Sequence, residues 1–470
     1  MSSSSDRTVA IVGGGISGLA LAESIQRKSQ AAGRPVRPIV LEAEDVVGGK
    51  VRSFSRDGFV VETGPHGFLG REPAVFELID RLGIRDELLR ADPASARRYL
   101  VRRGRLNEVE MSPPKFMTSD LLSVGGRMRI MMEPFIPAEP PEDESVKDFA
   151  KRRIGKEAAN VLVDAMVTGI YGGDPAQLSL QSAFPRMMEL EKNYGSLIKA
   201  QFALAKDRKE ESADEKATRE SLHSFKSGLQ VLIDGLARAV PDVRTGHAVD
   251  RITPTGRGVR LDGSFGSLHA DAVISTAPAH TLAKMIGPYA PGAAVESAGG
   301  VPYAPVTVVV LAFGAEEVQS ALTGFGYLAP HCEDRNLLGC VWASTVFPEH
   351  APAGYALFRC MLGGVRKAEL AGLDEETLIQ ICREELEQMV GLKPGAKLRM
   401  KEVIRWPEGI PQYNRGHHAR VEAAESLEQS VPGLVVGGNA YRGVAMIECV
   451  KVADPTADRA LAKVLQPVPA

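Results

Sequence analysis

Residues 8–18 read TVAIVGGGISG, and this stretch decides the fold class. The apolar run at residues 8–12 is typical of a strand buried in a parallel sheet. A glycine-rich turn follows at once, and residues 19–28 continue with helical spacing. A second buried strand, IVLEA, comes at residues 39–43. This order of strand, glycine turn, helix and strand is a βαβ unit, which predicts a doubly wound, Rossmann-type α/β fold.

The glycine turn matches G-x-G-x-x-G between a strand and a helix. Gly13 permits the tight turn, Gly15 lets the backbone approach a pyrophosphate, and Gly18 allows close packing of helix on strand. The helix N-terminus then presents amide donors and a positive dipole end to the phosphates. We therefore expect a dinucleotide to contact Gly13, Gly14, Gly15, Ile16, Ser17 and Gly18.

An acidic residue stands where a ribose would lie in such a fold. Glu42 ends the second strand, 24 residues past Gly18, and Ala43 follows it. A carboxylate at this place accepts hydrogen bonds from ribose hydroxyls. The alternative for Glu42 is an ordinary solvated acid at a strand end.

Gly48-Gly49-Lys50-Val51-Arg52 comes directly after this strand. Here the sequence resembles the amine-oxidase and protoporphyrinogen-oxidase superfamily, in which a glycine pair lets the backbone pass close to FAD. The resemblance implies FAD as the cofactor and adds Gly49 and Lys50 to its contacts. Arg52 is either a further cation for the pyrophosphate or a surface residue.

Further motifs make the resemblance to protoporphyrinogen oxidases closer. They occur in family order between residue 8 and about residue 450, at residues 62–68 (ETGPHGF), 168–174 (TGIYGGD), 228–232 (GLQVL), 324–326 (GFG), 361–364 (MLGG) and 410–417 (IPQYNRGH). The resemblance implies that Gly64, Pro65, His66 and Gly67 approach the flavin, and that Val249 contacts the cofactor in the second FAD-binding stretch.

The family fold implies three domains. We expect a discontinuous FAD-binding domain at residues 1–71, 222–280 and 405–470, and a β-rich substrate-binding domain at 72–90, 180–221 and 281–404. Residues 91–179 are expected to form an inserted helical domain that rests on a membrane. MRIMMEPFI at 128–136, with Arg127 and Arg129 beside it, suits contact with an anionic surface. A buried helix is the alternative for this segment.

The resemblance also implies substrate residues. A porphyrinogen is a large nonpolar macrocycle with propionate groups, so its pocket should be wide and apolar with one or two cations. Arg98 aligns with the arginine that binds a propionate, and arginine can grip a carboxylate with two parallel hydrogen bonds. Gly169, Phe325 and Met361 match positions that line the pocket. The alternatives are a solvated arginine at Arg98 and core packing for the other three residues.

The expected reaction is the six-electron oxidation of protoporphyrinogen IX to protoporphyrin IX in haem biosynthesis, with molecular oxygen reoxidising FAD. Coproporphyrinogen III is the alternative substrate, because it has four propionates and further arginines follow Arg98 at 102, 103 and 105. An amine-oxidase-type flavoenzyme and a non-catalytic flavin- or tetrapyrrole-binding protein are the remaining alternatives. No side chain is identified as a general base, since the flavin carries the hard chemistry.

The C-terminal flavin segment departs from the family pattern. The family reads G-V-[GA]-x-[NP]-D-C, whereas this chain has GVAMIEC at 443–449. Met446, Ile447 and Glu448 are the expected cofactor contacts, and Glu448 is a poorer helix N-cap than aspartate. Pro455, after Asp454, is expected to interrupt the helix that follows, which could weaken FAD binding.

Composition limits the other classes of function. A net charge of -3 argues against binding nucleic acid through bulk electrostatics. Five scattered cysteines lack both zinc-type spacing and a disulfide framework, so no metal site is expected and a cytoplasmic location is favoured. The first residues lack signal-peptide features, and no apolar stretch reaches the ~20 residues that span a bilayer. Peripheral contact with the inner face of the cell membrane and formation of a homodimer stay open.

Overall fold

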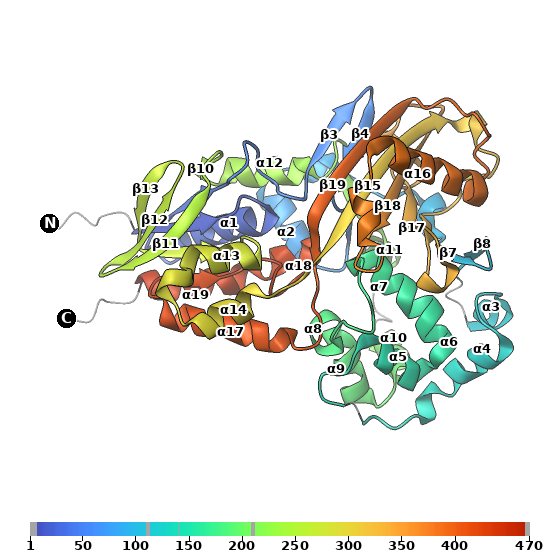
Figure 1. Cartoon of the computed structure of the whole chain (residues 1–470), viewed down its shortest axis with the longest axis horizontal. Helices are drawn as coiled ribbons and strands as arrows, with labels where there is room; N and C mark the ends of the chain where they lie inside the picture. The colour runs from blue at the N-terminus through green and yellow to red at the C-terminus, as the bar shows by residue number, and fades with distance from the viewer. Residues whose placement is uncertain (1–6, 110–112, 140, 208–211, 466–470) are drawn as a thin grey trace.

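The computed structural model describes residues 7–109, 113–139, 141–207 and 212–465. A parallel five-stranded sheet lies near both ends of the chain (Figure 1). Its strands, in spatial order, are β10 (Val243–Arg244), β2 (Val36–Leu41), β1 (Arg7–Val12), β14 (Ala272–Ser275) and β20 (Leu434–Val436). The βαβ unit predicted from residues 8–43 is therefore present, with α1 (Ile16–Ala31) between β1 and β2.

Alternate residues of β1 face two different layers. Val9 and Ile11 pack with α1, α12 (Gln230–Ala239) and α19 (Ala453–Leu465). Ala10 and Val12 belong to the opposite cluster. That cluster is built from α13 (Ala279–Ile286), α14 (Gly292–Gly299), α17 (His417–Ser430) and the antiparallel sheet β11 (Val249–Thr255), β12 (Gly258–Gly263) and β13 (Gly266–Ala270). Both faces of the parallel sheet are thus covered, as its continuous apolar strands require.

A second, mostly antiparallel sheet forms the other half of the molecule (Figure 1). Its seven strands are β19 (Met400–Pro411), β15 (Tyr303–Gly314), β18 (Tyr355–Gly363), β17 (Leu337–Trp342), β16 (Gly326–Leu328), β7 (Tyr99–Arg102) and β8 (Arg105–Glu108). The helix α16 (Glu375–Val390) covers one face, where Phe358, Cys360 and Leu362 of β18 are buried. Because side chains alternate along a strand, Arg359 and Met361 lie on the opposite face.

Two small sheets connect these halves. One is the hairpin β3 (Ser53–Arg56) and β4 (Phe59–Glu62). The other joins β5 (Phe68–Leu69), β9 (Leu222–Phe225) and β6 (Leu88–Arg90). The segment between β4 and β5 contains residues 64–67, so both of its ends are held by strands.

Helices between residues 113 and 207 form a lobe at one end of the second sheet (Figure 1). They are α3 (Pro113–Thr118), α4 (Val124–Met131), α5 (Val146–Ile154), α6 (Lys156–Ala158), α7 (Asp164–Tyr171), α8 (Leu180–Ala183), α9 (Pro185–Tyr194) and α10 (Leu197–Asp207), with a π-helical turn at Ala159–Val163. The helices expected within residues 91–179 therefore begin at Pro113. The next helix, α11 (Ala213–Glu220), lies against Gly70 instead.

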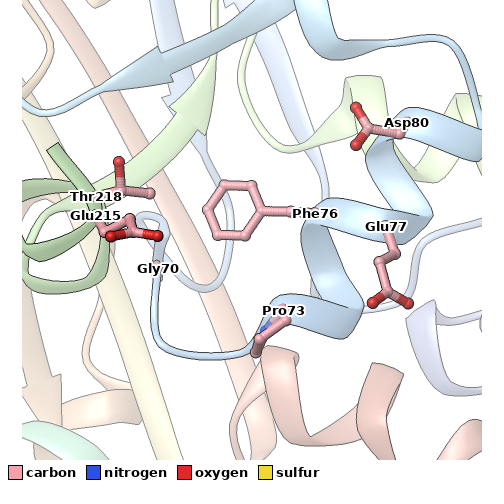
Figure 2. Close-up of a pocket in the computed structure, with 7 residues that line it drawn as sticks. All are labelled: Gly70, Pro73, Phe76, Glu77, Asp80, Glu215 and Thr218. Atoms are coloured by element: carbon pink, nitrogen blue, oxygen red, sulfur yellow. The ribbon is translucent and has the colours of Figure 1, made fainter. Parts of the chain in front are cut away.

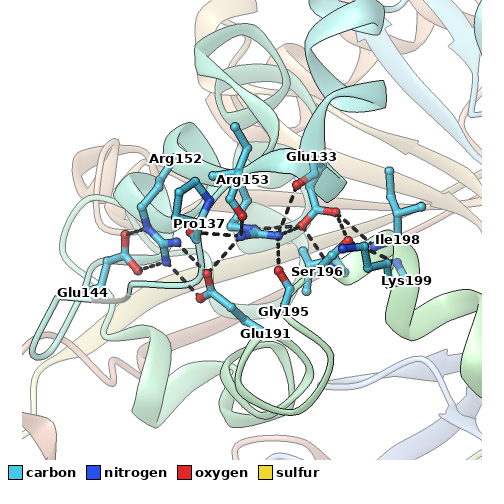
Figure 3. A network of polar contacts seen from close by, with 12 residues as sticks. Glu133, Pro137, Glu144, Arg152, Arg153, Glu191, Gly195, Ser196, Ile198 and Lys199 are labelled. Atoms are coloured by element: carbon cyan, nitrogen blue, oxygen red, sulfur yellow. Dashed lines mark hydrogen bonds and ion pairs between the residues drawn. The ribbon is translucent and has the colours of Figure 1, made fainter.

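Buried ion pairs hold this lobe together (Figure 3). Arg153 of α5 is fully buried, and its Nε donates to Glu133 over 2.8 Å. Next to it, Arg152 donates to Glu144 over 2.9 Å and to Glu191 of α9 over 2.6 Å. Segments that are distant in sequence are therefore locked by charge-assisted hydrogen bonds rather than by apolar packing alone.

The structure of two segments differs from the content expected of their domains. Residues 99–108, expected in the helical domain at 91–179, form β7 and β8 instead, because Tyr99 and Leu100 pair with β16. The helices at 180–207, expected in the substrate domain, pack on the helical lobe through α9 and α10. Residues 73–81 form the helix α2 (Pro73–Arg81), and residues 88–90 form the strand β6.

The C-terminal helix is broken, though not at Pro455. α18 (Met446–Lys451) and α19 (Ala453–Leu465) are separated at Val452. Pro455 lies in the first turn of α19, where a missing N–H costs little. Asp454 accepts hydrogen bonds from Ser24 and Arg27, both over 2.5 Å, which ties this turn to α1.

None of the helices in the described part of the chain has both the length and the apolar composition that a bilayer span needs.

Candidate active site

The glycine turn after β1 has the geometry that its sequence predicts. Gly13 has a φ of +108°, which favours glycine, and its N–H donates to Leu41 O over 2.8 Å. A Cβ placed on Gly18 would lie 1.9 Å from Gly13 O. No side chain fits at Gly18, so α1 can pack directly on β1 only with glycine there.

The start of α1 is free of competing side chains. Its N-cap is Gly15, without a side-chain cap and without an acidic residue in the first turn. Gly15 pairs with Gly48 in a parallel bridge, and a Cβ on Gly49 would lie 3.4 Å from the Gly15 Cα. Ile16 is buried and Ser17 half-buried. Two backbone segments thus meet at glycines, which leaves a cradle that could hold a pyrophosphate.

Glu42 is a buried acid that is already hydrogen-bonded to the backbone. Its Oε2 accepts from Gly14 N over 2.7 Å, and its Oε1 accepts from Glu44 N over 2.9 Å. Each carboxylate oxygen has a second lone-pair site, so the side chain can still accept from ribose hydroxyls. The solvated alternative is ruled out for Glu42, which is 9% exposed, whereas Ala43 is exposed. His247 N donates to Glu42 O over 2.8 Å, which brings the start of β11 at Val249 close to this acid.

Lys50 and Arg52 point away from the glycine cradle to partners on other strands. The Lys50 ammonium donates to Glu408 O and lies 5.6 Å from the ring centroid of Tyr303. Burial lowers the pKa of Lys50 to about 8, against the charge of Glu408. The Arg52 guanidinium lies 5.9 Å from the Trp406 ring centroid. Arg52 is therefore half-buried against a tryptophan, and the two alternatives stated for it are not separated.

The segment at residues 63–67 is held on two sides. Trp406 Nε1 donates to Thr63 O over 2.7 Å, and the Arg359 guanidinium donates to Gly64 O. A Cβ on Gly64 would lie 1.9 Å from Lys50 O, and one on Gly67 would lie 2.6 Å from His223 O. Both glycines are thus required by close backbone contacts with neighbouring segments, and Pro65 between them is half-buried.

His66 is the most unusual side chain of this segment. It is buried, and neither ring nitrogen has a hydrogen-bond partner within the described residues. Burial, followed by the charges of Arg359 and His350, lowers its pKa well below the usual range. The imidazole is therefore neutral at neutral pH. Since buried polar groups are almost always paired, these nitrogens indicate a missing partner.

The C-terminal segment contacts the glycine turn through the side chains of Cys449 and Ser17. Burial raises the pKa of the Cys449 thiol to about 11, and a hydrogen bond with Ser17 opposes this effect. The N-cap of α18 is Ala445 rather than Glu448, which lies inside the first turn. The prediction that Glu448 acts as a poor N-cap is therefore wrong, since the helix begins earlier. Met446 is buried, and Ile447 packs against the core that includes α1.

The candidate substrate residues converge on the same segment from two directions. The Arg98 guanidinium lies 4.7 Å from the centroid of the Phe325 ring, and that ring lies 6.5 Å from His66 in an edge-on arrangement. On the other side, Met361 Sδ lies 3.8 Å from Arg359 Nη1, and Arg359 contacts Gly64. Phe325 and Met361 are half-buried. Phe325 also packs against the buried residues Val341, Val346 and Phe347.

Gly169 is connected to these residues through Leu328. A Cβ on Gly169 would lie 2.9 Å from the Leu328 side chain, so α7 needs a glycine where it meets β16. Leu328 pairs with Gly339, which in turn pairs with Met361. The four candidate residues thus belong to one continuous region, although Gly169 is at its edge.

Three residues near the site were not among the predicted contacts: Glu62, His350 and Arg359. Glu62 is buried, accepts from Ser53 Oγ over 2.6 Å and from Leu229 N over 3.0 Å, and burial raises its pKa to about 7. His350 lies 6.3 Å from His66, ring to ring. The charged residue inside the apolar strand YALFRCMLG was the signal that could have indicated Arg359.

A separate hollow of about 340 Å³ lies between α2 and α11 (Figure 2). Its lining residues are Gly70, Pro73, Phe76, Glu77, Asp80, Glu215 and Thr218. Asp80 is paired with Arg85 over 2.5 Å, and Glu215 completes the capping box of α11. None of the predicted site residues lines this hollow, so it does not belong to the candidate active site.

Comparisons with known proteins agree with the dinucleotide-binding geometry of this site. The sequence matches the family described as flavin containing amine oxidoreductase over residues 16–461. The chain belongs to this family. It is also 31% identical to protoporphyrinogen oxidase 1 (chloroplastic) of Arabidopsis thaliana, over 95% of this chain and 86% of the relative. The resemblance of its motifs to the protoporphyrinogen oxidase family is thereby confirmed.

A relative with a different substrate in its name is almost as similar. Coproporphyrinogen III oxidase of Bacillus subtilis (strain 168) is 29% identical over 94% of this chain and 95% of the relative. Among solved structures, a protein of Exiguobacterium sp. 255-15 has a TM-score of 0.82 at 23% identity, covering 98% of this chain and all of that one. A putrescine oxidase variant has a TM-score of 0.70 at 15% identity, covering 97% of this chain and 99% of that one. These last two likenesses concern the fold.

The chain is thus an FAD-dependent oxidoreductase, and its residues fit that cofactor. The cradle at Gly15 and Gly49 would be filled by any Cβ at Gly49, and Glu42 retains acceptor capacity beside it. His66 supplies a buried polar group without a partner in the segment expected near the flavin. Within the described residues no group of three metal-binding side chains occurs.

Proposed function

We propose that this enzyme oxidises a porphyrinogen to the corresponding porphyrin, with protoporphyrinogen IX as the preferred substrate. The observation that carries the proposal is the line of contacts from Arg98 to Phe325 to His66. It sets a carboxylate-binding cation beside an aromatic surface, which in turn adjoins the segment expected at the flavin. A macrocycle with propionate groups matches this arrangement of apolar surface and cation.

The cofactor role is assigned to residues from every part of the cradle. We infer that the turn at 13–18 and Gly49 hold the pyrophosphate, that Glu42, Ala43 and Val249 lie along the adenosine half, and that Lys50 is a nearby cation. Residues 64–67 and 446–448 are assigned to the flavin half. Their support is the resemblance together with the contacts among Ser17, Cys449 and the glycine turn.

The chain's own residues orient the macrocycle and control its surroundings. FAD supplies the oxidising power, taking up two electrons in each of three rounds, and molecular oxygen regenerates it. Arg98 holds a propionate, while Phe325, Met361 and the backbone at Gly169 contact the ring system. His66 stays neutral at neutral pH, so it can accept a hydrogen bond but adds no charge.

Coproporphyrinogen III is the second candidate substrate. Desolvation, followed by the charge of Arg71, lowers the pKa of Arg98, so two guanidinium groups act on the same region. A substrate with four propionates could use both cations. The similarity to the Bacillus subtilis relative favours the same alternative.

An aerobic fluorescence assay tests the proposal. Purified enzyme with FAD is given protoporphyrinogen IX and coproporphyrinogen III in parallel, and the appearance of porphyrin fluorescence is followed. We expect both rates to exceed the spontaneous rate, with a higher kcat/KM for protoporphyrinogen IX. A higher value for coproporphyrinogen III would exchange the two substrates, and no enzyme-dependent rise with either would reject the proposal.

We also propose that the helical lobe contacts a membrane surface. Large apolar side chains are exposed on α4, on the turn that follows it and on α10, and Phe135 (82%) and Phe202 (73%) are the most exposed of them. Arg129 donates to the carbonyls of Arg152 and Arg153, and Arg127 donates to Ser119 O. The surface is therefore mainly apolar, and both arginines are engaged within the protein.

Co-sedimentation with vesicles tests the membrane contact. We expect binding to phosphatidylcholine vesicles with little dependence on anionic lipid or salt, because apolar burial dominates. Replacement of Phe135 by Ser should weaken it, whereas the exposed Tyr355→Ser, on the second sheet, should not. Binding that needs anionic lipid and disappears with salt would contradict the apolar mode.

A further inference from the structure

Arg359 is a buried cation that the proposed mechanism does not use. It lies on β18 and is 5% exposed. Its hydrogen-bond partners are uncharged: it donates to Gly64 O, to Glu62 O over 3.5 Å, and to Met361 Sδ over 3.8 Å. Within the described part of the chain, no carboxylate forms an ion pair with this guanidinium.

A buried charge without a counter-ion is costly for a folded protein. Burial lowers the pKa of Arg359 to about 10, so the side chain remains charged at neutral pH. The nearest electrostatic partner is Glu62, whose own pKa is raised by burial to about 7. Glu62 is thus only partly ionised at neutral pH, and it leaves much of the positive charge uncompensated.

The position of Arg359 connects the two halves of the candidate site. Its guanidinium contacts Gly64, in the segment expected at the flavin, and Met361, in the expected substrate pocket. Its charge is also one of the causes that lower the pKa of His66. An uncompensated cation at this point would stabilise a group that becomes negative during the reaction.

We propose that Arg359 is a fixed positive charge of the oxidation site, which stabilises the negative charge that the bound flavin gains on reduction. The inference rests on the proposed placement of the flavin at residues 64–67. In each round, two electrons and one proton leave a C–H bond of the porphyrinogen for the flavin. A second proton leaves the macrocycle for solvent, so that the three rounds together remove four meso C–H and two N–H hydrogens, and the reduced flavin would carry one negative charge. Arg359 acts through its charge and need not touch the substrate.

A purely structural role makes a different prediction. As a brace, Arg359 would only tie Gly64 to β18, and any side chain that donates a hydrogen bond there would suffice. Glutamine keeps a donor but loses the charge, whereas lysine keeps the charge but loses the planar, multi-donor group. The two substitutions therefore separate charge from bracing.

The reduction potential of the bound FAD is the readout, measured by reductive titration against a reference dye without porphyrinogen. In Arg359→Gln we expect the affinity for reduced relative to oxidised flavin to fall about tenfold, a shift of ~30 mV to lower potential for this two-electron couple. Arg359→Lys should keep the potential of the parent at neutral pH. The control is Arg383→Gln on α16, which removes an arginine that donates to a backbone carbonyl on the other face of the same sheet.

Three results would overturn the inference. They are an unchanged potential in Arg359→Gln, an equal shift in both variants, or a raised KM for porphyrinogen with an unchanged potential, which would assign the charge to a substrate carboxylate.

If Arg359→Gln does not retain FAD, Arg359→Lys decides alone. A buried lysine loses its proton at lower pH than arginine, so its potential should fall below that of the parent between about pH 7 and about pH 9. Parallel pH profiles would then reject the inference. Because the titration needs no substrate, a shift in potential can stand even if porphyrinogen is not oxidised.

Discussion

At the scale of single residues, the candidate site depends on side chains whose neighbours cannot replace them. Arg98 illustrates this point, since other arginines follow it closely but only its guanidinium is found over the Phe325 ring. An arginine at this place can bind a carboxylate with two parallel hydrogen bonds.

Replacement of Arg98 by Ala should raise KM for protoporphyrinogen IX by about tenfold or more, because a hydrogen bond to a charged group is worth ~1.5–3 kcal/mol. The FAD content should not change. Steady-state kinetics and the flavin absorbance measure both quantities. The matched control is the exposed Arg105→Ala on β8, which should leave KM near the parent value. Equal effects of the two substitutions would remove Arg98 from the site.

Gly18 gives a second prediction for a single residue. The Cβ of an alanine there would lie 1.9 Å from Gly13 O, so α1 must move off β1 and the cradle must open. We expect Gly18→Ala to lose most of its bound FAD and to melt at a lower temperature. Gly292→Ala at the start of α14 meets nothing within 4 Å and should retain both properties. Parent-like FAD content in Gly18→Ala would show that the close packing at this glycine is not needed.

At the scale of helices and strands, the helical lobe depends on buried ions more than its sequence indicates. Arg153 and Glu133 are both fully buried, and Glu133 also accepts from Leu197 N over 2.9 Å. This pair joins α5, α10 and the turn that carries Phe135, as Figure 3 shows. The exposed apolar surface of the lobe is thus held in place by a polar core.

Loss of one partner should therefore destabilise the lobe strongly. Arg153→Met leaves Glu133 buried without its cation, at an expected cost of about 3–5 kcal/mol. The exposed pair Arg186 and Glu189 provides the control, since Arg186→Met should cost no more than about 1 kcal/mol. Limited proteolysis and thermal unfolding measure the difference. Comparable stability of the two variants would contradict the role given to the buried network.

Local patterns predicted the elements whose partners are close in sequence. The βαβ unit at residues 7–41 follows from apolar periodicity and glycine positions. The strands β7 and β8 could not be predicted in this way, because their partner β16 is distant along the chain. The shared face of Arg359 and Met361 follows from strand alternation. What that face meets depends on the pairing of β18 with β15 and β17, and this pairing is not visible in the local sequence.

The residues of the candidate site could be predicted from the sequence where they belong to a recognisable motif. The contacts of Gly13, Gly18 and Glu42 follow from their spacing, whereas the hydrogen bond from Gly14 to Glu42 does not. The N-cap of α18 shows the opposite case. The departure from the family motif was visible at Glu448, but the start of the helix at Met446 depends on packing against α1.

At the scale of the whole molecule, buried neutral histidines link stability to pH. The pKa values of His66, His223, His350 and His417 are all lowered by burial, to about 4 for His223 and His417. Between these values and the usual 6.5, the unfolded chain binds more protons than the folded chain. The contribution of these histidines to stability should therefore be complete above about pH 6.5 and should decline as the pH falls toward about 4. Glu62, whose pKa is raised to about 7 by burial, offsets about one proton of this effect.

Urea unfolding at several pH values between about 7.5 and about 4.5 measures this decline, with each additional proton worth about 1.4 kcal/mol per pH unit. His223→Gln should reduce the slope, because its ring stacks on Phe68 at a centroid distance of 5.8 Å in a buried position. A free energy of unfolding that does not change across this range would show that these imidazoles are not held neutral.

The central claim is that a porphyrinogen delivers its electrons to the flavin of this chain, and an anaerobic single-turnover experiment tests it most directly. Oxidised holoenzyme is mixed with protoporphyrinogen IX, from limiting to excess concentrations, in the absence of oxygen, and the visible absorbance of the flavin is followed. The account predicts rapid bleaching of the flavin, slowed in Arg98→Ala when the porphyrinogen is limiting, and recovery of the absorbance when oxygen is admitted. A flavin that stays oxidised with both protoporphyrinogen IX and coproporphyrinogen III, while a chemical reductant bleaches it, would contradict the account.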